Sequence, residues 1–260
     1  MTAALELHRE LAGSRALVVG GYGGIGTVVC TELAEAGAAV AVAGRSLEKA
    51  TALAAELTDT GATAAAHVVD VNDRASVQRL VAAVVSSLGG IDILVNCASV
   101  LVTSPAEQFD EADWRAVLEV NLVGAFWLSQ AVGQLMINTG AGGRIIHLSS
   151  VRSQAGASRG FSAYGASKAG LNLLVKQLAT EWGRHRIAVN AVAPGFVRTE
   201  FVQAAAADPQ FLKMVTGRIP LGRTAEAGEI ADAVLYLASP RSSFITGQIL
   251  FVDGGVTASQ

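Results

Sequence analysis

The sequence predicts an α/β fold, with one doubly wound parallel sheet of about seven strands and helices on both faces. Short apolar segments alternate with helix-like segments along the chain, which is the rhythm of β-α-β units with right-handed crossovers. The 260 residues are 51% hydrophobic and 16% charged and include 28 glycines, a composition that suits helices packed closely on a parallel sheet. We therefore expect a single domain over residues 1–260.

The strands are expected where apolar runs end in turn or polar residues, and the helices where the intervening pattern becomes helical. Strands are predicted over residues 14–20, 38–43, 64–69, 91–95, 144–148, 187–193 and 248–252. Helices are predicted over residues 27–36, 47–59, 74–88, 111–138, 162–184 and 224–239. Ser46 and Asp73 stand where they can cap the second and third of these helices.

Residues 196–222 follow no regular pattern and include Pro209, Gly217 and Pro220. A long insertion beside a site is often a lid that closes over the substrate. We predict such a lid here, and a pair of solvated loops is the alternative.

Charge and cysteine content exclude several classes of protein. The net charge is −3 with no block of like charges, so neither nucleic acid nor a membrane is expected as a partner. The longest uncharged run, 16–31, holds five glycines and is shorter than the roughly 20 apolar residues of a membrane span. Glu6 and Glu10 do not fit a signal peptide. Cys30 and Cys97 have no metal-ligand spacing, so we expect no metal site and a reducing, cytoplasmic location.

The glycine-rich turn after the first strand reads GGYGGIG and opens a helix. Two registers fit a nucleotide-binding turn, one with Gly21, Gly23 and Gly26 and one with Gly20, Gly24 and Gly26. Glycines let the backbone approach a pyrophosphate, and the helix N-terminus offers free N–H groups. Strand, turn and helix together predict the first half of a nucleotide-binding unit, although a plain tight turn uses the same residues.

A phenol and an amine lie four residues apart at Tyr164 and Lys168. In a helix this spacing puts both side chains on one face. The ammonium should lower the pKa of the phenol below its reference of about 10, so that Tyr164 can exchange a proton near neutral pH. Ser150, at the end of the preceding strand, could hold a carbonyl oxygen against the phenol, with Ser149 as a minor alternative. The competing interpretation is a chance pair, with the tyrosine packed and the lysine solvated.

Other polar residues follow the ends of predicted strands, where ligands bind in open α/β sheets. The residues directly after strand ends include Gly20, Arg45, Asp70, Asn96 and Ser150. Asn121 falls inside a predicted helix, which its propensity disfavours and which indicates a specific function. His147 precedes the serines within a strand and is expected in the core or behind the site.

In this order the motifs resemble the classical short-chain dehydrogenase/reductase family, over about residues 11–255. The matching pieces are Gly20-x-x-x-Gly24-Ile25-Gly26, Asp70, Asn96-Cys97-Ala98, Asn121, Ser150, Tyr164-x-x-x-Lys168, Pro194-Gly195-x-x-x-Thr199 and Val252-Asp253-Gly254-Gly255. Each piece is common alone, and the ordered set is specific.

The resemblance implies a Rossmann-type sheet, a nicotinamide cofactor and hydride transfer at a carbonyl or secondary alcohol. It implies that Tyr164 is the acid/base and that Ser150 orients the substrate oxygen. Lys168 would lower the tyrosine pKa and hold the nicotinamide ribose, and Asn121 would position a water that links Lys168 to solvent. The cofactor-binding residues it implies are Gly20, Tyr22, Gly23, Gly24, Ile25, Gly26, Arg45, Ser46, Asp70, Val71, Asn96, Ala98, Tyr164, Lys168, Pro194, Gly195, Val197 and Thr199.

The resemblance also implies a homotetramer, paired through the helices near residues 111–138 and 162–184 and packed around the last strand. Small apolar side chains on the second of these helices suit close contact, although core packing could use them instead. These residues are Ala163, Ala166, Ala169 and Leu173.

Four features depart from the family pattern. Val19 stands where the family usually has Thr, Cys97 replaces the second Asn of Asn-Asn-Ala-Gly, and Ser99 replaces its Gly. Ser150 and Tyr164 are 14 residues apart, about one more than usual, which enlarges a substrate-side loop.

The end of the second strand indicates which dinucleotide binds. NAD-linked sites usually place an acid there to bond the ribose 2′-OH, but no acid occurs before Glu48. Gly44 is expected to leave room for a 2′-phosphate, Arg45 to add charge and Ser46 a hydroxyl. We therefore predict NADP(H) over NAD(H). The preference should be modest, because Gly23 stands where many NADPH-linked relatives carry a basic residue.

The leading interpretation of function is an NADP(H)-linked oxidoreductase acting on a ketone or secondary alcohol. The first alternative is an NAD-linked sugar, polyol or aldonate dehydrogenase, because residues 151–153 and 181–182 resemble that part of the family. Arg152 and Arg159, beside Ser153 and Gln154, favour a polar or anionic substrate, with a solvent-facing loop as the alternative.

Two further alternatives stay open. Arg144, Arg184 and Arg186 could meet an acidic acyl carrier protein, as a 3-oxoacyl-carrier-protein reductase requires, although surface arginines are usually just solvated. A catalytically idle nucleotide-binding scaffold is the non-enzyme alternative. The intact set of Ser150, Tyr164, Lys168 and Asn121 argues against idleness, since a scaffold needs none of these residues.

Overall fold

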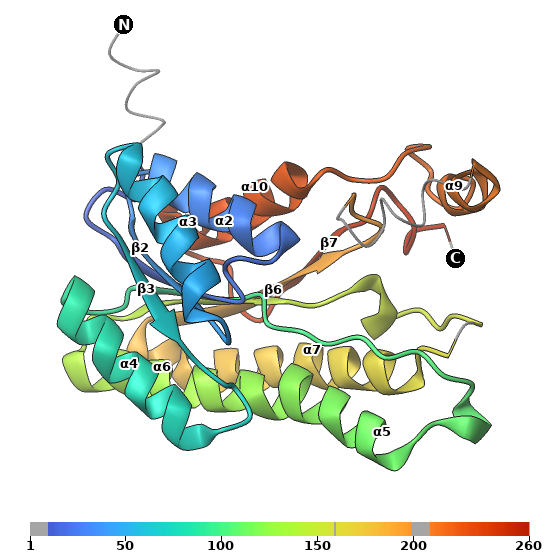
Figure 1. The fold of residues 1–260 in the computed structure, drawn as a ribbon, viewed down its shortest axis with the longest axis horizontal. Helices are drawn as coiled ribbons and strands as arrows, with labels where there is room; N and C mark the ends of the chain where they lie inside the picture. Colours follow the sequence, from blue (N-terminus) through green and yellow to red (C-terminus); the bar gives the residue numbers. More distant parts are fainter. Residues whose placement is uncertain (1–9, 159, 199–208, 260) are drawn as a thin grey trace, which may run out of the picture.

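The computed structural model describes residues 10–158, 160–198 and 209–259. Within them, seven parallel strands form one sheet in the order β3-β2-β1-β4-β5-β6-β7, as predicted. The strands are β1 (Arg15–Val19), β2 (Ala39–Gly44), β3 (Ala64–Val68), β4 (Ile93–Asn96), β5 (Gly143–Leu148), β6 (Ile187–Pro194) and β7 (Ile249–Val252). Figure 1 shows helices in a layer on either side of this sheet.

Each helical layer covers its own half of the core. α2 (Gly24–Glu35), α3 (Leu47–Asp59) and α10 (Ala227–Ala238) lie on one face, and α4 (Arg74–Leu88), α5 (Glu111–Leu118), α6 (Gly124–Thr139) and α7 (Ser162–Trp182) lie on the other. Alternate residues of β1 divide between the two faces: Ala16 and Val18 pack with the first layer, and Leu17 and Val19 pack with the second. Both faces of the strand are therefore apolar, as a central parallel strand requires.

The direction in which successive strands are added to the sheet reverses at β1. From β1 the chain runs outward to β2 and β3, then returns to β4 on the other side of β1. The last residue of β1, Val19, pairs with Ala43 on one side and Asn96 on the other. Crossover loops leave these two neighbours in opposite directions, which opens a crevice at the carboxyl ends of the strands.

The predicted caps are confirmed. The Ser46 hydroxyl accepts the N–H of Lys49 at 3.3 Å, and the Asp73 carboxylate accepts the N–H of Ala75 at 2.8 Å. By contrast, α2 begins at Gly24, three residues before its predicted start, with Gly23 as its N-cap and no side-chain cap. The first N–H groups of α2 are thus open to a ligand.

The helix predicted over 111–138 is interrupted. A π-helical turn, Glu119–Val123, joins α5 to α6 around Asn121. The combined helix Glu111–Thr139 is long and apolar enough to cross a membrane by length and composition alone, with a mean hydropathy of 1.3 over its best window, of which 44% is buried inside the molecule. Leu128, Val132 and Met136 of this helix belong to the core, so packing accounts for much of its apolar character.

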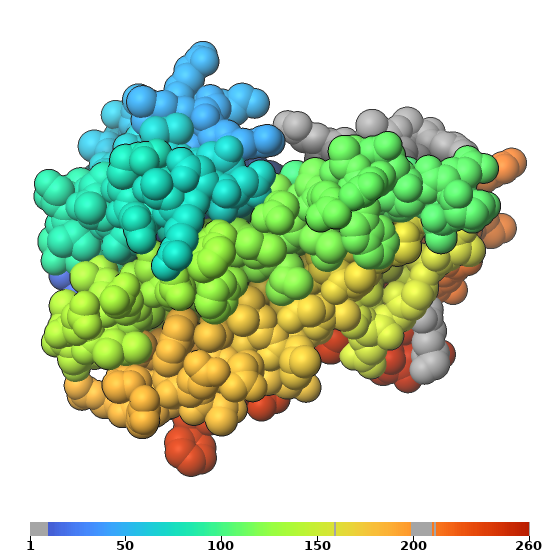
Figure 2. Space-filling model, turned by 90° about the horizontal axis from the view of Figure 1, so that it is seen from below, coloured from blue at the N-terminus to red at the C-terminus, as the bar shows by residue number. Residues whose placement is uncertain are grey.

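The face formed by α4, α5, α6 and α7 is seen from below in Figure 2. Ala163 of α7 is fully buried in the core, whereas Ala166, Ala169 and Leu173 are exposed. Of the four residues predicted to suit helix pairing, only the last three are therefore available on the surface.

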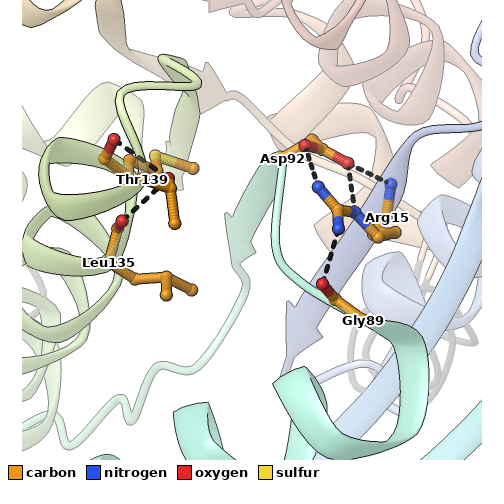
Figure 3. Close-up of polar contacts among 6 residues, drawn as sticks. Arg15, Gly89, Asp92, Leu135 and Thr139 are labelled. Atoms are coloured by element: carbon orange, nitrogen blue, oxygen red, sulfur yellow. Dashed lines mark hydrogen bonds and ion pairs between the residues drawn. The ribbon is translucent and has the colours of Figure 1, made fainter.

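An ion pair fixes the edge of the sheet at which the strands begin (Figure 3). The guanidinium of Arg15 donates to both carboxylate oxygens of Asp92 at 2.7 Å and to the carbonyl of Gly89 at 2.7 Å. The backbone N–H of Arg15 also donates to Asp92, at 2.9 Å. These contacts tie the start of β1 to the segment before β4.

Part of the predicted lid, residues 199–208, lies outside the described residues. The described part includes α9 (Pro209–Thr216), and Val215 and Ile219 pack with Val256 and Phe196 in a small cluster of their own. Leu221 donates its N–H to the carbonyl of Gly254 at 3.1 Å. This segment therefore rests on the chain after β7, and its function as a lid stays a prediction.

Candidate active site

A cavity of about 730 Å³ opens at the carboxyl ends of the central strands. It brings together the glycine turn, the end of β5, the first turn of α7 and the end of β6. The predicted site residues that line it are Gly20, Tyr22, Gly23, Gly24, Ile25, Gly26, Ser150, Tyr164, Lys168, Pro194, Gly195 and Val197.

The glycine turn fits a dinucleotide because two of its positions exclude any side chain. A Cβ on Gly26 would lie 2.2 Å from the carbonyl oxygen of Gly20. Gly20 has a φ of +76°, and a Cβ there would lie 2.9 Å from the backbone nitrogen of Ala98. These contacts bring the turn, the helix and the loop after β4 close together, and the uncapped N-terminus of α2 faces the same cavity. Backbone N–H groups in this arrangement suit a pyrophosphate.

The space above Gly44 is filled by Tyr22, so the prediction that Gly44 leaves room for a phosphate is wrong. A Cβ on Gly44 would lie 2.5 Å from the Tyr22 ring. The phenol oxygen of Tyr22 accepts the N–H of Ser46 at 2.7 Å. The glycine is therefore needed for the tyrosine, which fastens the glycine turn to the start of α3.

Ser150 and Tyr164 meet as predicted. Ser150 lies two residues beyond the end of β5 in an extended conformation, and its hydroxyl oxygen accepts the N–H of Arg152 at 3.1 Å. Its proton is left for another acceptor in the cavity, and the Ser150 hydroxyl lowers the pKa of the Tyr164 phenol. Ser149, the minor alternative, instead donates its proton to the Asn172 side chain at 2.6 Å. Ser150 is therefore the serine that faces the phenol.

Burial, not the lysine, dominates the acidity of the phenol. It raises the pKa of Tyr164 above its ordinary value, against hydrogen bonds from Ser150 and Ser99 and the charge of Arg152. The prediction that the neighbouring ammonium brings this pKa below its reference is wrong here. The Nζ atom of Lys168 lies 5.6 Å from the centre of the tyrosine ring and donates to the carbonyl of Leu148 at 2.8 Å.

Lys168 is only 1% exposed. Burial lowers the pKa of its ammonium to about 8. The low-dielectric site thus drives both groups toward their neutral forms, the phenol by raising its pKa and the ammonium by lowering it. The phenolate needs a donor or a cation close by to become accessible.

Asn121 uses every hydrogen-bonding position of its side chain. Its oxygen accepts from the Ser99 hydroxyl at 3.1 Å and from the Val100 N–H at 2.8 Å. Its amide group donates to the Val100 carbonyl at 2.9 Å and to the Ser167 hydroxyl at 3.1 Å. No group of the amide is left for the predicted water, so such a water would have to bind another atom, such as the backbone carbonyl in the π-helical turn.

Behind the cavity, His147 is fully buried, as expected of a core residue. Burial lowers the pKa of its imidazole to about 3. Ser129 gives its proton to a carbonyl of its own helix and so accepts from Nε2 of His147, at 2.9 Å. Nδ1 then accepts from the Asn96 amide at 3.3 Å, and the Asn96 oxygen accepts the N–H of Ala98 at 3.1 Å. A neutral imidazole therefore orients the loop beside the glycine turn.

Known proteins match this chain over nearly its whole length. A family model described as "Enoyl-(Acyl carrier protein) reductase" matches residues 20–257. Gluconate 5-dehydrogenase of Gluconobacter oxydans is 38% identical, over 96% of this chain and 97% of its own. The chain belongs to the classical short-chain dehydrogenase/reductase family.

Two other relatives bear on the chemistry of this short-chain dehydrogenase/reductase. A crystal structure of a gluconate 5-dehydrogenase from Burkholderia cenocepacia in complex with NADP and tartrate is 40% identical, with a TM-score of 0.92, and covers 98% of this chain and 99% of its own. Galactitol 2-dehydrogenase (L-tagatose-forming) of Cereibacter sphaeroides is 39% identical, over 95% of this chain and 96% of its own. The protein is an oxidoreductase that acts on alcohol and carbonyl groups, in a family that uses NAD(P)(H).

Several predicted residues of this dehydrogenase/reductase do not line the cavity. Val71 packs against α6, where a Cβ on Gly124 would lie 2.9 Å from it, and the carboxylate of Asp70 accepts the N–H of Asn72 at 3.0 Å. Thr199 lies outside the described residues. The described residues that were predicted for the site but are not among the lining of this cavity are Arg45, Ser46, Asp70, Val71, Asn96, Ala98 and Asn121.

The cavity also includes residues that sequence reasoning missed. Lys49 lines it from the first turn of α3, and Cys97 and Ser99 line it from the loop after β4. Lys49 could have been found as the first cation after Arg45, three residues beyond the Ser46 cap. Burial raises the pKa of the Cys97 thiol to about 12, so this cysteine is a neutral wall residue.

The arginines considered for an acyl carrier protein lie at the wrong edge of the sheet. Arg144 is in the first part of β5, and its guanidinium donates to the carbonyls of Ala238 and Ser239 at 3.0 and 3.1 Å. Arg186 precedes β6 and bonds the carbonyl of Gly140. The six residues of β5 separate this edge from Ser150 by about 20 Å. Arg144 stabilises the end of α10, so Arg144 and Arg186 do not support the carrier-protein alternative.

Proposed function

We propose that this enzyme transfers a hydride between NADP(H) and a polyhydroxy carboxylate, at one of its secondary alcohol or ketone carbons. The observation that carries the proposal is the cation of Arg152 next to Tyr164, without a carboxylate partner among the described residues. Two relatives that are gluconate 5-dehydrogenases, one of them in complex with tartrate, support the same substrate class.

Tyr164 is proposed as the acid/base. During reduction its phenol gives a proton to the substrate oxygen while the nicotinamide, when bound, supplies the hydride. Ser150 keeps its own proton available and bonds the same oxygen, since its lone pair already accepts from Arg152. Lys168 would stabilise the phenolate and hold the nicotinamide ribose. Asn121 would hold the loop at 99–100 against these groups.

Arg152 lines a second cavity, of about 650 Å³, together with residues 153–158 and Phe161. Its guanidinium lies 5.3 Å from the ring of Phe161 and 5.9 Å from the ring of Phe196, and it donates to the carbonyl of Gly156 at 3.3 Å. Burial lowers the pKa of this group, and repulsion from Arg218 lowers it further. Two neighbouring cations that repel each other favour an anionic ligand. Arg159, the other predicted residue, lies outside the described residues.

We propose NADP(H) as the preferred cofactor, with NAD(H) as the alternative. Support comes from the end of β2, where Arg45 is exposed and forms no hydrogen bond or ion pair with any part of the chain that the structure describes. Lys49 adds a second cation at the edge of the cavity. The two charges together can replace the basic residue that Gly23 does not provide.

The test compares gluconate and 5-ketogluconate with galactitol, each with NADP(H) and with NAD(H). We expect turnover of the sugar acids with NADP(H). In Arg152→Ala, KM should rise about 10- to 100-fold for the sugar acids alone, which corresponds to the loss of one charge-assisted hydrogen bond. Arg184→Ala is the matched control, because Arg184 is an exposed arginine at the other edge of the sheet, and this variant should change KM for neither kind of substrate. Preference for galactitol, or an equal loss for both substrates in Arg152→Ala, would overturn the carboxylate assignment.

A cytoplasmic homotetramer is part of the same proposal. The exposed side chains of Ala166, Ala169 and Leu173 on α7 support pairing through that helix, and Leu173 is 68% exposed. Phe244, before β7, and Leu250, within it, are exposed apolar residues as well. Light scattering at micromolar concentration tests this, and the mass of a monomer would contradict it.

A further inference from the structure

Ser99 is a hydroxyl at the catalytic centre that the relay of Ser150, Tyr164 and Lys168 does not include. It lies in the loop after β4, lines the same cavity as these three residues and is exposed. In the sequence it stands out only because the family usually carries glycine at this position. A glycine would give the phenol of Tyr164 no second hydroxyl neighbour.

The position of this hydroxyl is fixed by Asn121. The Ser99 oxygen donates to the Asn121 oxygen at 3.1 Å, and the next residue, Val100, is bonded to the same amide through both its N–H and its carbonyl. Asn121 is in turn bonded to Ser167, on the helix that carries Tyr164. The π-helical turn thus holds Ser99 directly and links its loop to α7.

Ser99, Ser150 and Tyr164 line the same cavity. From this position the Ser99 hydroxyl, like that of Ser150, favours the charged form of Tyr164 and lowers the pKa of its phenol. A serine has one proton and two lone pairs. Because Ser99 gives its proton to Asn121, it can only accept from a neutral phenol. If the phenol loses its proton, rotation of the Ser99 hydroxyl turns that proton from Asn121 to the phenolate.

We propose that Ser99 is a positioning residue for the acid/base step, which orients the phenol of Tyr164 and donates a hydrogen bond to the phenolate formed when the proton moves to the substrate oxygen. The proposal rests on the proposed function of Tyr164. In the step itself the O–H bond of Tyr164 breaks and an O–H bond forms on the substrate, while the substrate carbon receives the hydride. Ser99 keeps its own proton throughout.

The charged and titratable groups around the phenol come from three elements. Lys168 is on the same helix, Arg152 is in the turn after β5 with Arg218 beside it, and Cys97 is in the loop after β4. Burial opposes the phenolate, whereas Ser99, Ser150 and Arg152 favour it. Loss of the Ser99 hydroxyl removes one of the favourable contributions and leaves the cations unchanged.

The test is the pH profile of kcat/KM for gluconate oxidation with NADP⁺, a direction that requires the phenolate. In Ser99→Ala the rising limb should move to higher pH by about half to one unit. Below the limb, kcat/KM of the variant should be roughly three- to tenfold lower than that of the wild type, and above it the two values should converge. Ser99→Thr keeps the hydroxyl and should restore the wild-type profile. In the Tyr164→Phe background, Ser99→Ala should cause no further loss.

A second measurement does not depend on the substrate. The near-ultraviolet phenolate absorbance of each protein, after subtraction of the corresponding Tyr164→Phe variant, reports the titration of Tyr164 alone. We expect it at higher pH in Ser99→Ala than in the wild type. An unchanged titration, or an equal shift in Ser99→Thr, would overturn the proposal. Failure of gluconate as a substrate, or normal turnover by Tyr164→Phe, would overturn the proposed function instead, and the absorbance titration would still decide the role of Ser99.

Discussion

The two edges of the same sheet use charge in opposite ways. At the edge where the strands begin, Arg15 is fully paired with Asp92 (Figure 3), and Arg144 bonds two carbonyls at the end of α10. At the edge where the strands end, neither Lys168 nor Arg152 has a carboxylate within salt-bridge distance in the described ranges. The first edge therefore stabilises the fold, and the second keeps positive charge without a counter-ion.

The difference shows that the edge with the proposed active site is less stable than it could be, because its positive charges have no counter-ions. A buried ammonium without a counter-ion is costly, and a protein retains it when a ligand supplies the missing negative charge. The dinucleotide phosphates, the phenolate and an anionic substrate would all supply it at this edge. Substitutions at the two edges should accordingly differ in the sign of their effect on stability, and only those at the second edge should affect catalysis.

The largest effect is expected from Tyr164→Phe, which keeps the ring and removes the proton donor. Turnover should fall about 10²- to 10⁴-fold, whereas folding and NADPH binding should survive. Steady-state kinetics and NADPH fluorescence titration measure the two parts. Near-normal turnover by the purified variant would show that the proton donor lies elsewhere.

The next largest effect is expected from substitutions at the proposed binding site for the cofactor phosphate. Arg45→Ala should weaken NADPH binding by about 10- to 100-fold, the value of one charge-assisted hydrogen bond, and leave NADH nearly unchanged. Lys49→Ala should act in the same direction, because the second cation lines the same cavity. Titration of both cofactors into each protein measures this, and tighter binding of NADH than of NADPH by the wild type would contradict the assignment.

Lys168→Met should abolish activity and yet raise the free energy of unfolding at pH 7 by about 1–3 kcal/mol, since a buried charge is removed. The pKa of about 8 in the folded state lies below the unfolded value of about 10.4, so the unfolded chain binds more protons between them. Wild-type stability should rise over that range and the gap to the variant should close. Denaturant titrations at several pH values test this, with the exposed Lys176→Met as control; a less stable variant at pH 7 would refute the comparison.

The smallest effect is expected at the other edge. Asp92→Asn weakens the pairing with the partly exposed Arg15 and should lower the free energy of unfolding by about 1 kcal/mol without changing kcat. Hydrogen bonds from Arg15 lower the pKa of Asp92, so the contribution is present at neutral pH and is lost as pH falls through the folded-state pKa. The wild type and the variant should therefore converge below about pH 4. Loss of activity in Asp92→Asn at neutral pH would show that the two edges are coupled.

Local sequence determined the element order, the sheet and most boundaries. Apolar runs of strand length can only be buried between two helical layers, and Ser46 and Asp73 cap their helices through contacts within two or three residues. The order of Ser150, Tyr164 and Lys168 was enough to predict that these three side chains share one cavity, because an end of a strand and one face of a helix place them with little freedom.

Only the tertiary structure decided what surrounds those residues. The acidity of Tyr164 depends on burial by segments far away in sequence, and that burial outweighs the neighbouring lysine. Likewise, Tyr22 fills the space above Gly44, and Ser99 reaches Tyr164 through a loop that Asn121 holds. Spacing along the chain fixes contacts within one element, whereas desolvation and contacts between loops are set by three-dimensional packing, which no local pattern encodes.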